Sequence, residues 1–251
     1  KPSMITSPIL RMQPCAAVQW HPRSRIPEFA HTMSLIWQPL IQASTPRRAM
    51  LAIMFLYAIL NTAYSIAFPI FESWDELHHY DYVRYLIEQR ELPVIDEDAG
   101  ETEYHQPPAY YLITALLTPY LPADDYRPEV NDAFAQPYWY QHNKNRYIHL
   151  RSVEGWPWRG IALNVHIMRL LGLLWGGAAM VLAYHLADRL QPAEPGGDWM
   201  PVAAAALTGF NPTFLYIMSS VNNEAMATAI GAALSLALVD VAARGLTPRR
   251  A

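Results

Sequence analysis

The stretch Ala49–Phe71, AMLAIMFLYAILNTAYSIAFPIF, decides the fold, because its 23 residues contain no charge. As an α-helix it covers about 35 Å, enough to cross a hydrocarbon core of about 30 Å with some tilt. Arg47 and Arg48 come directly before it, and basic residues at the end of a span indicate the cytoplasmic side. We therefore expect an uncleaved membrane anchor with a cytoplasmic amino-terminal end.

Three further apolar runs follow, at residues 166–186, 201–219 and 225–243. Asn211-Pro212 lies inside the second of these and predicts a kink there, because proline cannot donate the helical hydrogen bond. With four spans, residues 72–165 form a long extracytoplasmic loop, and Arg189, Arg244, Arg249 and Arg250 fall on the cytoplasmic side. The predicted fold is an all-α integral membrane protein with about four transmembrane helices.

The remaining regions agree with this organisation. Residues 1–45 show no helical periodicity and predict a disordered cytoplasmic tail, and residues 46–251 form the polytopic membrane domain. The chain starts at Lys1 and ends in basic residues directly after the fourth run. We therefore expect it to be the amino-terminal part of a longer protein, located in a prokaryotic plasma membrane.

Composition excludes several classes of protein. Only 16% of the 251 residues are charged and 52% are hydrophobic, whereas soluble domains carry about 25% charged residues. A formal net charge of −4 gives no support for binding nucleic acid, which requires a basic patch. Cys15 is the single cysteine, so the chain has no intramolecular disulfide.

The long loop contains two predicted helices. Ser73–Arg90 has an apolar stripe at helical spacing, which predicts an amphipathic helix on the membrane surface. Ala109–Leu121 is apolar but has only 13 residues, which is too short to span, so we expect a re-entrant or interfacial helix. The aromatic residues of the 122–160 region fit either an interfacial belt or a surface that stacks on sugars or peptides.

Asp75 and Glu76 follow the first span and are candidate catalytic carboxylates. Ser73 and Glu76 also fit a capping box, so a purely structural role is an alternative. His79 lies one helical turn after Asp75 and shares its face. His78, His79 and His105, with the two acids, offer a weak alternative as ligands of a divalent metal, but their spacing matches no zinc motif.

Three more polar groups map to the same face of the predicted membrane. They are His105-Gln106, which begins a rigid turn or positions a substrate; Asn222-Asn223-Glu224, which caps a helix or binds a substrate; and Arg169, which snorkels to the interface or binds a phosphate. Four polar groups that are far apart in sequence are thus expected at one interface.

Several of these motifs resemble the C-type membrane glycosyltransferase superfamily. They are Trp74-Asp75-Glu76, then Tyr80-Asp81-Tyr82, then His105-Gln106-Pro107-Pro108-x-Tyr110-Tyr111, and finally Ser219-Ser220-Val221-Asn222-Asn223-Glu224. The similarity covers about residues 50–245 and looks closest to an uncharacterised prokaryotic branch of the superfamily. His78-His79 and the long aromatic insertion at 122–160 depart from the family pattern.

The resemblance implies transfer of a sugar from a polyprenyl-phosphate donor to an acceptor at the extracytoplasmic face. Asp75 matches the position of the general base, and Glu76 matches a second acid. We expect the substrate-binding residues to be His79, His105, Gln106, Tyr110, Arg169, Asn222, Asn223 and Glu224. Neither the donor sugar nor the acceptor can be read from the sequence.

The alternative is a non-catalytic polytopic membrane protein. It would be a lipid- or glycan-binding homologue, or a fragment of a transporter or scaffold. A transporter needs polar residues lining a path at mid-membrane, and the predicted spans offer few of them: Asn61, Thr62 and Asn211. The concentration of polar groups at one face favours chemistry at the membrane surface.

Overall fold

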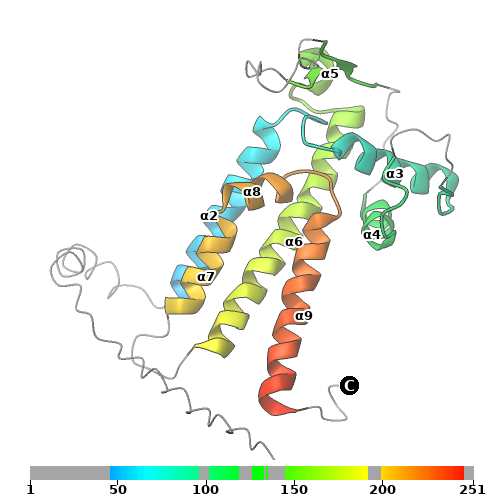
Figure 1. The fold of residues 1–251 in the computed structure, drawn as a ribbon. Coiled ribbons are helices and arrows are strands. Elements are labelled where there is room, and N and C mark those ends of the chain that lie inside the picture. Colours follow the sequence, from blue (N-terminus) through cyan, green and yellow to red (C-terminus); the bar gives the residue numbers. More distant parts are fainter. Residues whose placement is uncertain are drawn as a thin grey trace, which may run out of the picture. The chain divides into compact units, whose positions relative to one another are not determined.

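The computed structural model describes residues 46–95, 102–118, 126–132, 134, 145–191 and 199–245 (Figure 1). The predicted tail at residues 1–45 and part of the aromatic region lie outside these ranges. The helices are α2 (Pro46–Ala67), α3 (Glu76–Gln89), α4 (Ala109–Leu117), α5 (Arg151–Glu154), α6 (Gly160–Leu190), α7 (Met200–Gly209), α8 (Pro212–Met218) and α9 (Glu224–Arg244). Two short strands, β1 (Glu129–Val130) and β2 (Tyr147–Ile148), pair antiparallel. The all-α fold class is confirmed.

Three of the described helices are long and apolar enough to cross a membrane: α2, α6 and α9. They correspond to the first, second and fourth predicted spans. The second is longer than predicted, because α6 begins at Gly160 and continues for 31 residues. Three apolar helices of this length indicate association with a membrane.

The third predicted span is divided into two short helices. α7 has 10 residues and α8 has 7, with Phe210 and Asn211 between them. Asn211 is extended, and its side-chain oxygen accepts hydrogen bonds from the N–H groups of Thr213 at 2.9 Å and Phe214 at 3.4 Å. Pro212, which has no N–H, starts the new helix. The kink predicted at Asn211-Pro212 is a full interruption, so the structure does not confirm the third predicted span as one continuous helix.

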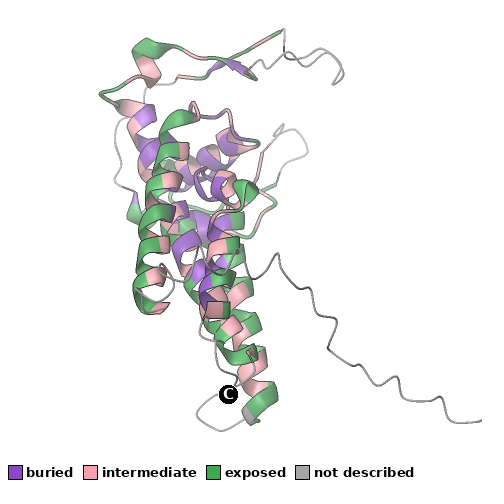
Figure 2. Cartoon of the chain, turned by 90° about the vertical axis from the view of Figure 1, so that its left-hand side faces the viewer, coloured by how far each residue is buried: buried purple, intermediate pink, exposed green. Residues whose placement is uncertain are grey.

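Helix α6 packs against both the long and the short helices of the membrane domain. It contacts α2, α7, α8 and α9, and Figure 1 shows it between α2 and α9. Two glycines permit the close approach. A Cβ atom at Gly172 would collide with the carbonyl oxygen of Met218, and one at Gly176 would collide with the Tyr57 hydroxyl. Small residues at such crossings are typical of membrane helices. Buried residues gather where the helices meet, and exposed ones lie on their outer faces (Figure 2).

Helices α3 and α4 pack together and share a core with the beginning of α6. The amphipathic prediction is confirmed, because Tyr80 and Val83 of α3 are buried while Glu88 and Gln89 are exposed. The predicted short helix is also present, as α4. The buried members of this core are Ile70, Phe71, Tyr80, Tyr82, Val83, Leu86, Tyr110, Tyr111, Tyr147, Ile161, Ala162, Val165, Met168 and Val221. This core fixes the start of the α2–α6 connection, where the candidate site lies, against α6.

Candidate functional site

The candidate site is organised around a buried ion pair between Glu76, the first residue of α3, and Arg169 of α6. The Arg169 side chain is 1% exposed and that of Glu76 is 0% exposed. Arg169 donates from Nε to Glu76 Oε1 at 2.8 Å and from an Nη atom to Oε2 at 2.6 Å. This is a two-point contact, the strongest geometry available to arginine and carboxylate.

The other Arg169 donors are also used. The guanidinium bonds the carbonyl oxygens of Ser65 at 2.6 Å, Phe68 at 2.9 Å and Pro69 at 3.1 Å. These carbonyls lie at the end of α2 and directly after it, where the helix leaves carbonyls without partners. Five N–H groups therefore meet five acceptors, and a guanidinium has no more than five. Arg169, which we expected at the interface or on a phosphate, thus has all of its donors engaged inside the protein.

The Glu76 carboxylate, predicted as a catalytic acid, has further partners inside the protein. Its Oε2 accepts from the Phe71 N–H at 2.9 Å, and its Oε1 accepts from the Val221 N–H at 2.8 Å. The capping-box interpretation is also incorrect, since the residue at the amino-terminal cap of α3 is Asp75 and makes no side-chain capping bond. A fully buried carboxylate with three partners holds its surroundings together and cannot reach a substrate.

Asp75, in contrast, is half-buried and lies at the surface end of this arrangement. Its φ of 60° places it in the left-handed region, which aspartate tolerates better than most residues. The Trp74 N–H before it donates to the Tyr216 hydroxyl of α8 at 3.0 Å. Asp75 is therefore set between a residue bonded to α8 and a residue bonded to α6, and among the residues that the structure describes its carboxylate makes no capping hydrogen bond.

His79 does not pair with Asp75 through its ring. Its backbone N–H bonds the Asp75 carbonyl at 3.0 Å, but its Nδ1 shares a hydrogen bond of 2.7 Å with the Tyr111 hydroxyl of α4. Burial, and then the nearby His78 and His105, lower the pKa of His79 to about 4. The ring is neutral at physiological pH and connects α3 to α4.

The predicted convergence with the turn between α8 and α9 is partly present. Asn223 Nδ2 donates to Gln106 Oε1 at 3.1 Å, which joins two predicted groups that are 117 residues apart. Asn222 is buried, and its side-chain oxygen accepts from the Ala225 N–H at 3.2 Å. It therefore accepts from the first turn of α9, while the residue at the cap, Asn223, makes no side-chain capping bond. Glu224 is exposed in the first turn of α9.

His105 and Tyr110 have different surroundings. His105 is 60% exposed and lies 3.7 Å from the Glu103 carboxylate. Tyr110 is 1% exposed, within the core between α4 and the turn that precedes α9. Its hydroxyl is too buried to contact a substrate directly. The alternative metal site at His78, His79 and His105 has no support, because within the part of the chain that the structure describes no three His, Cys, Asp or Glu side chains form a possible metal site.

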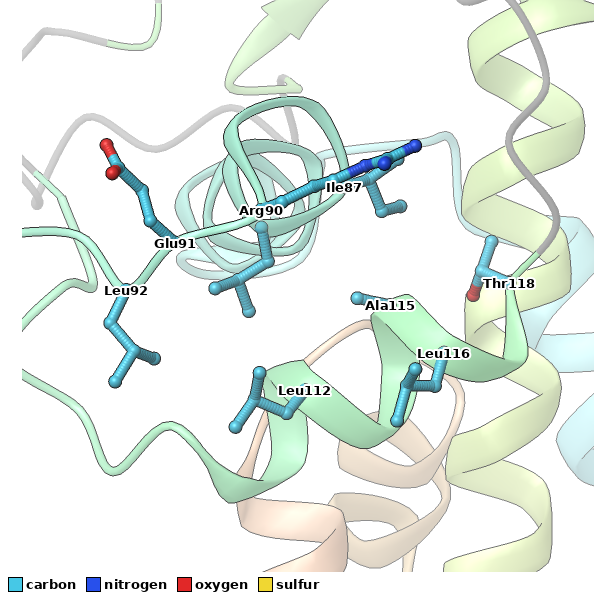
Figure 3. A pocket seen from close by; sticks show the side chains of 9 residues that line it. Ile87, Arg90, Glu91, Leu92, Leu112, Ala115, Leu116 and Thr118 are labelled. Atoms are coloured by element: carbon cyan, nitrogen blue, oxygen red, sulfur yellow. The ribbon is translucent and has the colours of Figure 1, made fainter.

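A pocket of about 480 Å³ lies between the end of α3 and α4 (Figure 3). Its lining is mostly apolar: Leu86, Ile87, Leu92, Leu112, Ala115 and Leu116, with Thr118, Arg90 and Glu91. In Figure 3 Leu92, Leu112 and Leu116 lie around the gap, while the Glu91 carboxylate is turned away from α4. The pocket is suited to an apolar chain.

Sequence reasoning missed two groups in the α2–α6 connection. Glu72 and Glu154 bond opposite nitrogens of His149, at 2.9 Å and 2.8 Å. Trp74, next to Asp75, is 63% exposed and carries the Arg146 guanidinium above its ring at 5.3 Å. Arg146 and His149 belong to the aromatic-rich insertion, and no local spacing connects them to residues 72–76. The sole signal in the sequence for the contact with Arg146 was that residue 74 is a tryptophan, since cations stack on tryptophan more readily than on other rings.

Comparisons of the chain with protein-family models, with curated proteins and with solved structures gave no match.

Proposed function

We propose that the protein is a membrane glycosyltransferase, or part of one, that transfers a sugar from a polyprenyl-phosphate donor to an acceptor at the extracytoplasmic face. The observation that carries this proposal is the contrast between neighbours: Glu76 is fully buried and saturated, while Asp75 is half-buried and held rigidly beside it. A carboxylate that is fixed in place and reachable is what a general base requires.

The proposed reaction is a displacement at the anomeric carbon. Asp75 accepts the proton of an acceptor hydroxyl while that oxygen forms a bond to the anomeric carbon. The bond from this carbon to the phosphate oxygen breaks, and the lipid phosphate leaves with the electron pair. Phosphate is a stable leaving anion, so the protein has to position the acceptor and stabilise charge rather than supply a strong acid.

The proposed topology places Asp75 on the outside. Arg47 and Arg48 begin α2, and Arg189 lies in the last turn of α6. A hollow of about 600 Å³ is lined by residues from both of these helix ends, which places them at one side of the membrane domain. The positive-inside rule assigns that side to the cytoplasm. The interrupted pair α7–α8 would provide the third of four crossings, and the host membrane would be a prokaryotic plasma membrane.

The pocket between α3 and α4 supports a donor that carries a hydrocarbon chain. It opens at the carboxyl end of α3, whereas Asp75 lies at the amino end. The 14 residues of α3 separate the two by about 20 Å. A polyprenyl chain is long enough to cover this distance, with its sugar phosphate near Asp75 and its tail in the pocket.

The test is transfer of a radiolabelled sugar from a set of polyprenyl-phosphate sugars by the full-length protein in lipid nanodiscs. Transfer to any acceptor hydroxyl supports the proposal. Thermal stabilisation by such a lipid with no transfer would favour the alternative, a non-catalytic lipid- or glycan-binding protein. The apolar pocket is the observation that favours this alternative.

A further inference from the structure

The side chain of Arg146 occupies an unusual position for a cation. Its guanidinium carbon lies 5.3 Å from the centre of the Trp74 ring and 5.3 Å from the centre of the Tyr147 ring. Both distances are within the range of an attractive cation–π contact. Trp74 is the residue immediately before Asp75, so this cation lies on the direct sequence neighbour of the proposed base.

The backbones around this cation are fixed. The Arg146 N–H donates to Glu72 Oε1 at 2.5 Å, and the Arg146 carbonyl accepts from the Asn131 N–H at 2.9 Å. Trp74 is held through its own N–H by the Tyr216 hydroxyl. Although the Trp74 ring is exposed, the two stacked groups are therefore attached to defined points of the fold. A site that is formed in advance binds without the cost of ordering its side chains.

The guanidinium donors of Arg146 are not consumed by the protein. Across the described ranges no carboxylate forms an ion pair with Arg146, and none of its side-chain N–H groups has a hydrogen-bond acceptor. Other arginines of this region are paired: Arg84 with Glu88, Arg127 with Asp81, and Arg169 with Glu76. Glu72 accepts from the backbone N–H of Arg146, and its oxygens are taken by that group, the Tyr147 N–H and His149.

A guanidinium that lies over an aromatic ring keeps its N–H groups, which point outwards in the guanidinium plane, available for other acceptors. That edge matches two oxygens of a phosphate, and stacking reduces the rotamer freedom that binding would otherwise remove. We propose that Arg146, stacked on Trp74, binds a phosphate group beside Asp75. The proposal deepens the proposed function and rests on it for the carrier of the phosphate, which would be the lipid-linked donor.

The experiment measures phosphate binding directly, by titration calorimetry on the full chain in maltoside detergent. The two probes are inorganic phosphate and geranyl phosphate, a short soluble isoprenyl phosphate. We expect Arg146→Gln to weaken geranyl phosphate binding by about tenfold or more, the loss expected for a two-point charged hydrogen bond. Arg146→Lys keeps the positive charge but not the paired N–H donors of the guanidinium. Its affinity for geranyl phosphate should therefore lie between that of the wild-type protein and that of Arg146→Gln.

The matched control is Arg127→Gln, which removes another arginine of the same connection that is already paired with Asp81. It should leave the affinity unchanged. Neutral geraniol serves as a second control, because a role of Arg146 in folding alone would change geraniol and geranyl phosphate binding together. Equal affinity of wild-type and Arg146→Gln for geranyl phosphate would overturn the proposal, as would the absence of binding to either probe.

The probes also separate the possible carriers of the phosphate. Tighter binding of geranyl phosphate than of inorganic phosphate supports a lipid carrier, and equal binding assigns the site to free phosphate and overturns the lipid carrier. Failure of the phosphate-binding proposal for Arg146 is distinguishable from failure of the proposed glycosyltransferase function. Asp75→Asn should retain phosphate binding while losing sugar transfer, and Arg146→Gln is judged by binding alone.

Discussion

Arg169 and Glu76 form a buried ion pair at 2.6 Å although 93 residues separate them in the sequence. The pair attaches the first residue of α3 to α6. Further hydrogen bonds of the two side chains reach the end of α2 and the turn before α9. Breaking it should be costly, because removal of one partner leaves the other charged and buried. Glu76→Gln is expected to lower the free energy of unfolding by about 3–5 kcal/mol.

The matched control for this prediction is Glu88→Gln. Glu88 pairs with Arg84 at 2.6 Å on an exposed helix face, where such a pair contributes about 0.5 kcal/mol or less. Thermal and denaturant unfolding in detergent measure both variants. Equal stability losses for the two substitutions would show that the Arg169–Glu76 pair does not hold the fold together.

Gly172 and Gly231 provide a second pair of variants with opposite expectations. A Cβ atom at Gly172 meets the Met218 carbonyl oxygen, whereas a Cβ at Gly231 on α9 meets nothing within 4 Å. Gly172→Ala should separate α6 from the end of α8 and lower the stability by about 1–3 kcal/mol. Gly231→Ala should be neutral or stabilising by up to about 1 kcal/mol, because alanine favours helix. The measurement is the melting temperature of each variant compared with that of the wild-type protein. A Gly172→Ala variant as stable as the wild-type protein would contradict the close packing of α6 against the end of α8.

His79 predicts a dependence of stability on pH. Its pKa falls from 6.5 to about 4 on folding, so below pH 6.5 the unfolded chain takes up a proton that the folded chain does not. The contribution of neutral His79 to the free energy of unfolding is complete above pH 6.5 and is lost as the pH falls towards 4. At about 1.4 kcal/mol per pKa unit, the loss is up to about 3 kcal/mol.

The measurement for His79 is the melting temperature between pH 4 and 7, compared for wild-type and His79→Gln. Glutamine retains a polar group near the Tyr111 hydroxyl but does not titrate. The wild-type curve should fall more steeply than that of the variant as the pH is lowered. Parallel curves would mean that another group is responsible for the acid sensitivity.

The helices could be predicted from the sequence because their signals are local. Apolar runs of membrane length give α2, α6 and α9, and the apolar stripe through Tyr80 and Val83 gives α3. The Asn211-Pro212 pair marked the position of the break, but not its extent. Whether a helix resumes as one span depends on how Asn211 caps α8, which propensity alone does not decide.

The candidate site could be predicted only in part, because its contacts are long-range. Local spacing made Glu76 a capping residue and Arg169 an interfacial cation, and each is the more common local role. Their actual pairing depends on α3 and α6 meeting in the fold. The same holds for Arg146 on Trp74, which are 72 positions apart by their numbers. Gln106 and Asn223 were expected at one face, and their hydrogen bond agrees with that expectation.

The central claim is that Asp75 is the general base, and Asp75→Asn tests it most directly. Asparagine adopts the left-handed conformation as readily as aspartate, so the φ of 60° is preserved while the base is removed. Sugar transfer by the full-length protein should fall by at least about a hundredfold, with unchanged melting temperature. Glu129→Gln, at an exposed position on β1, should transfer at the wild-type rate. Transfer by Asp75→Asn at the wild-type rate would contradict the account.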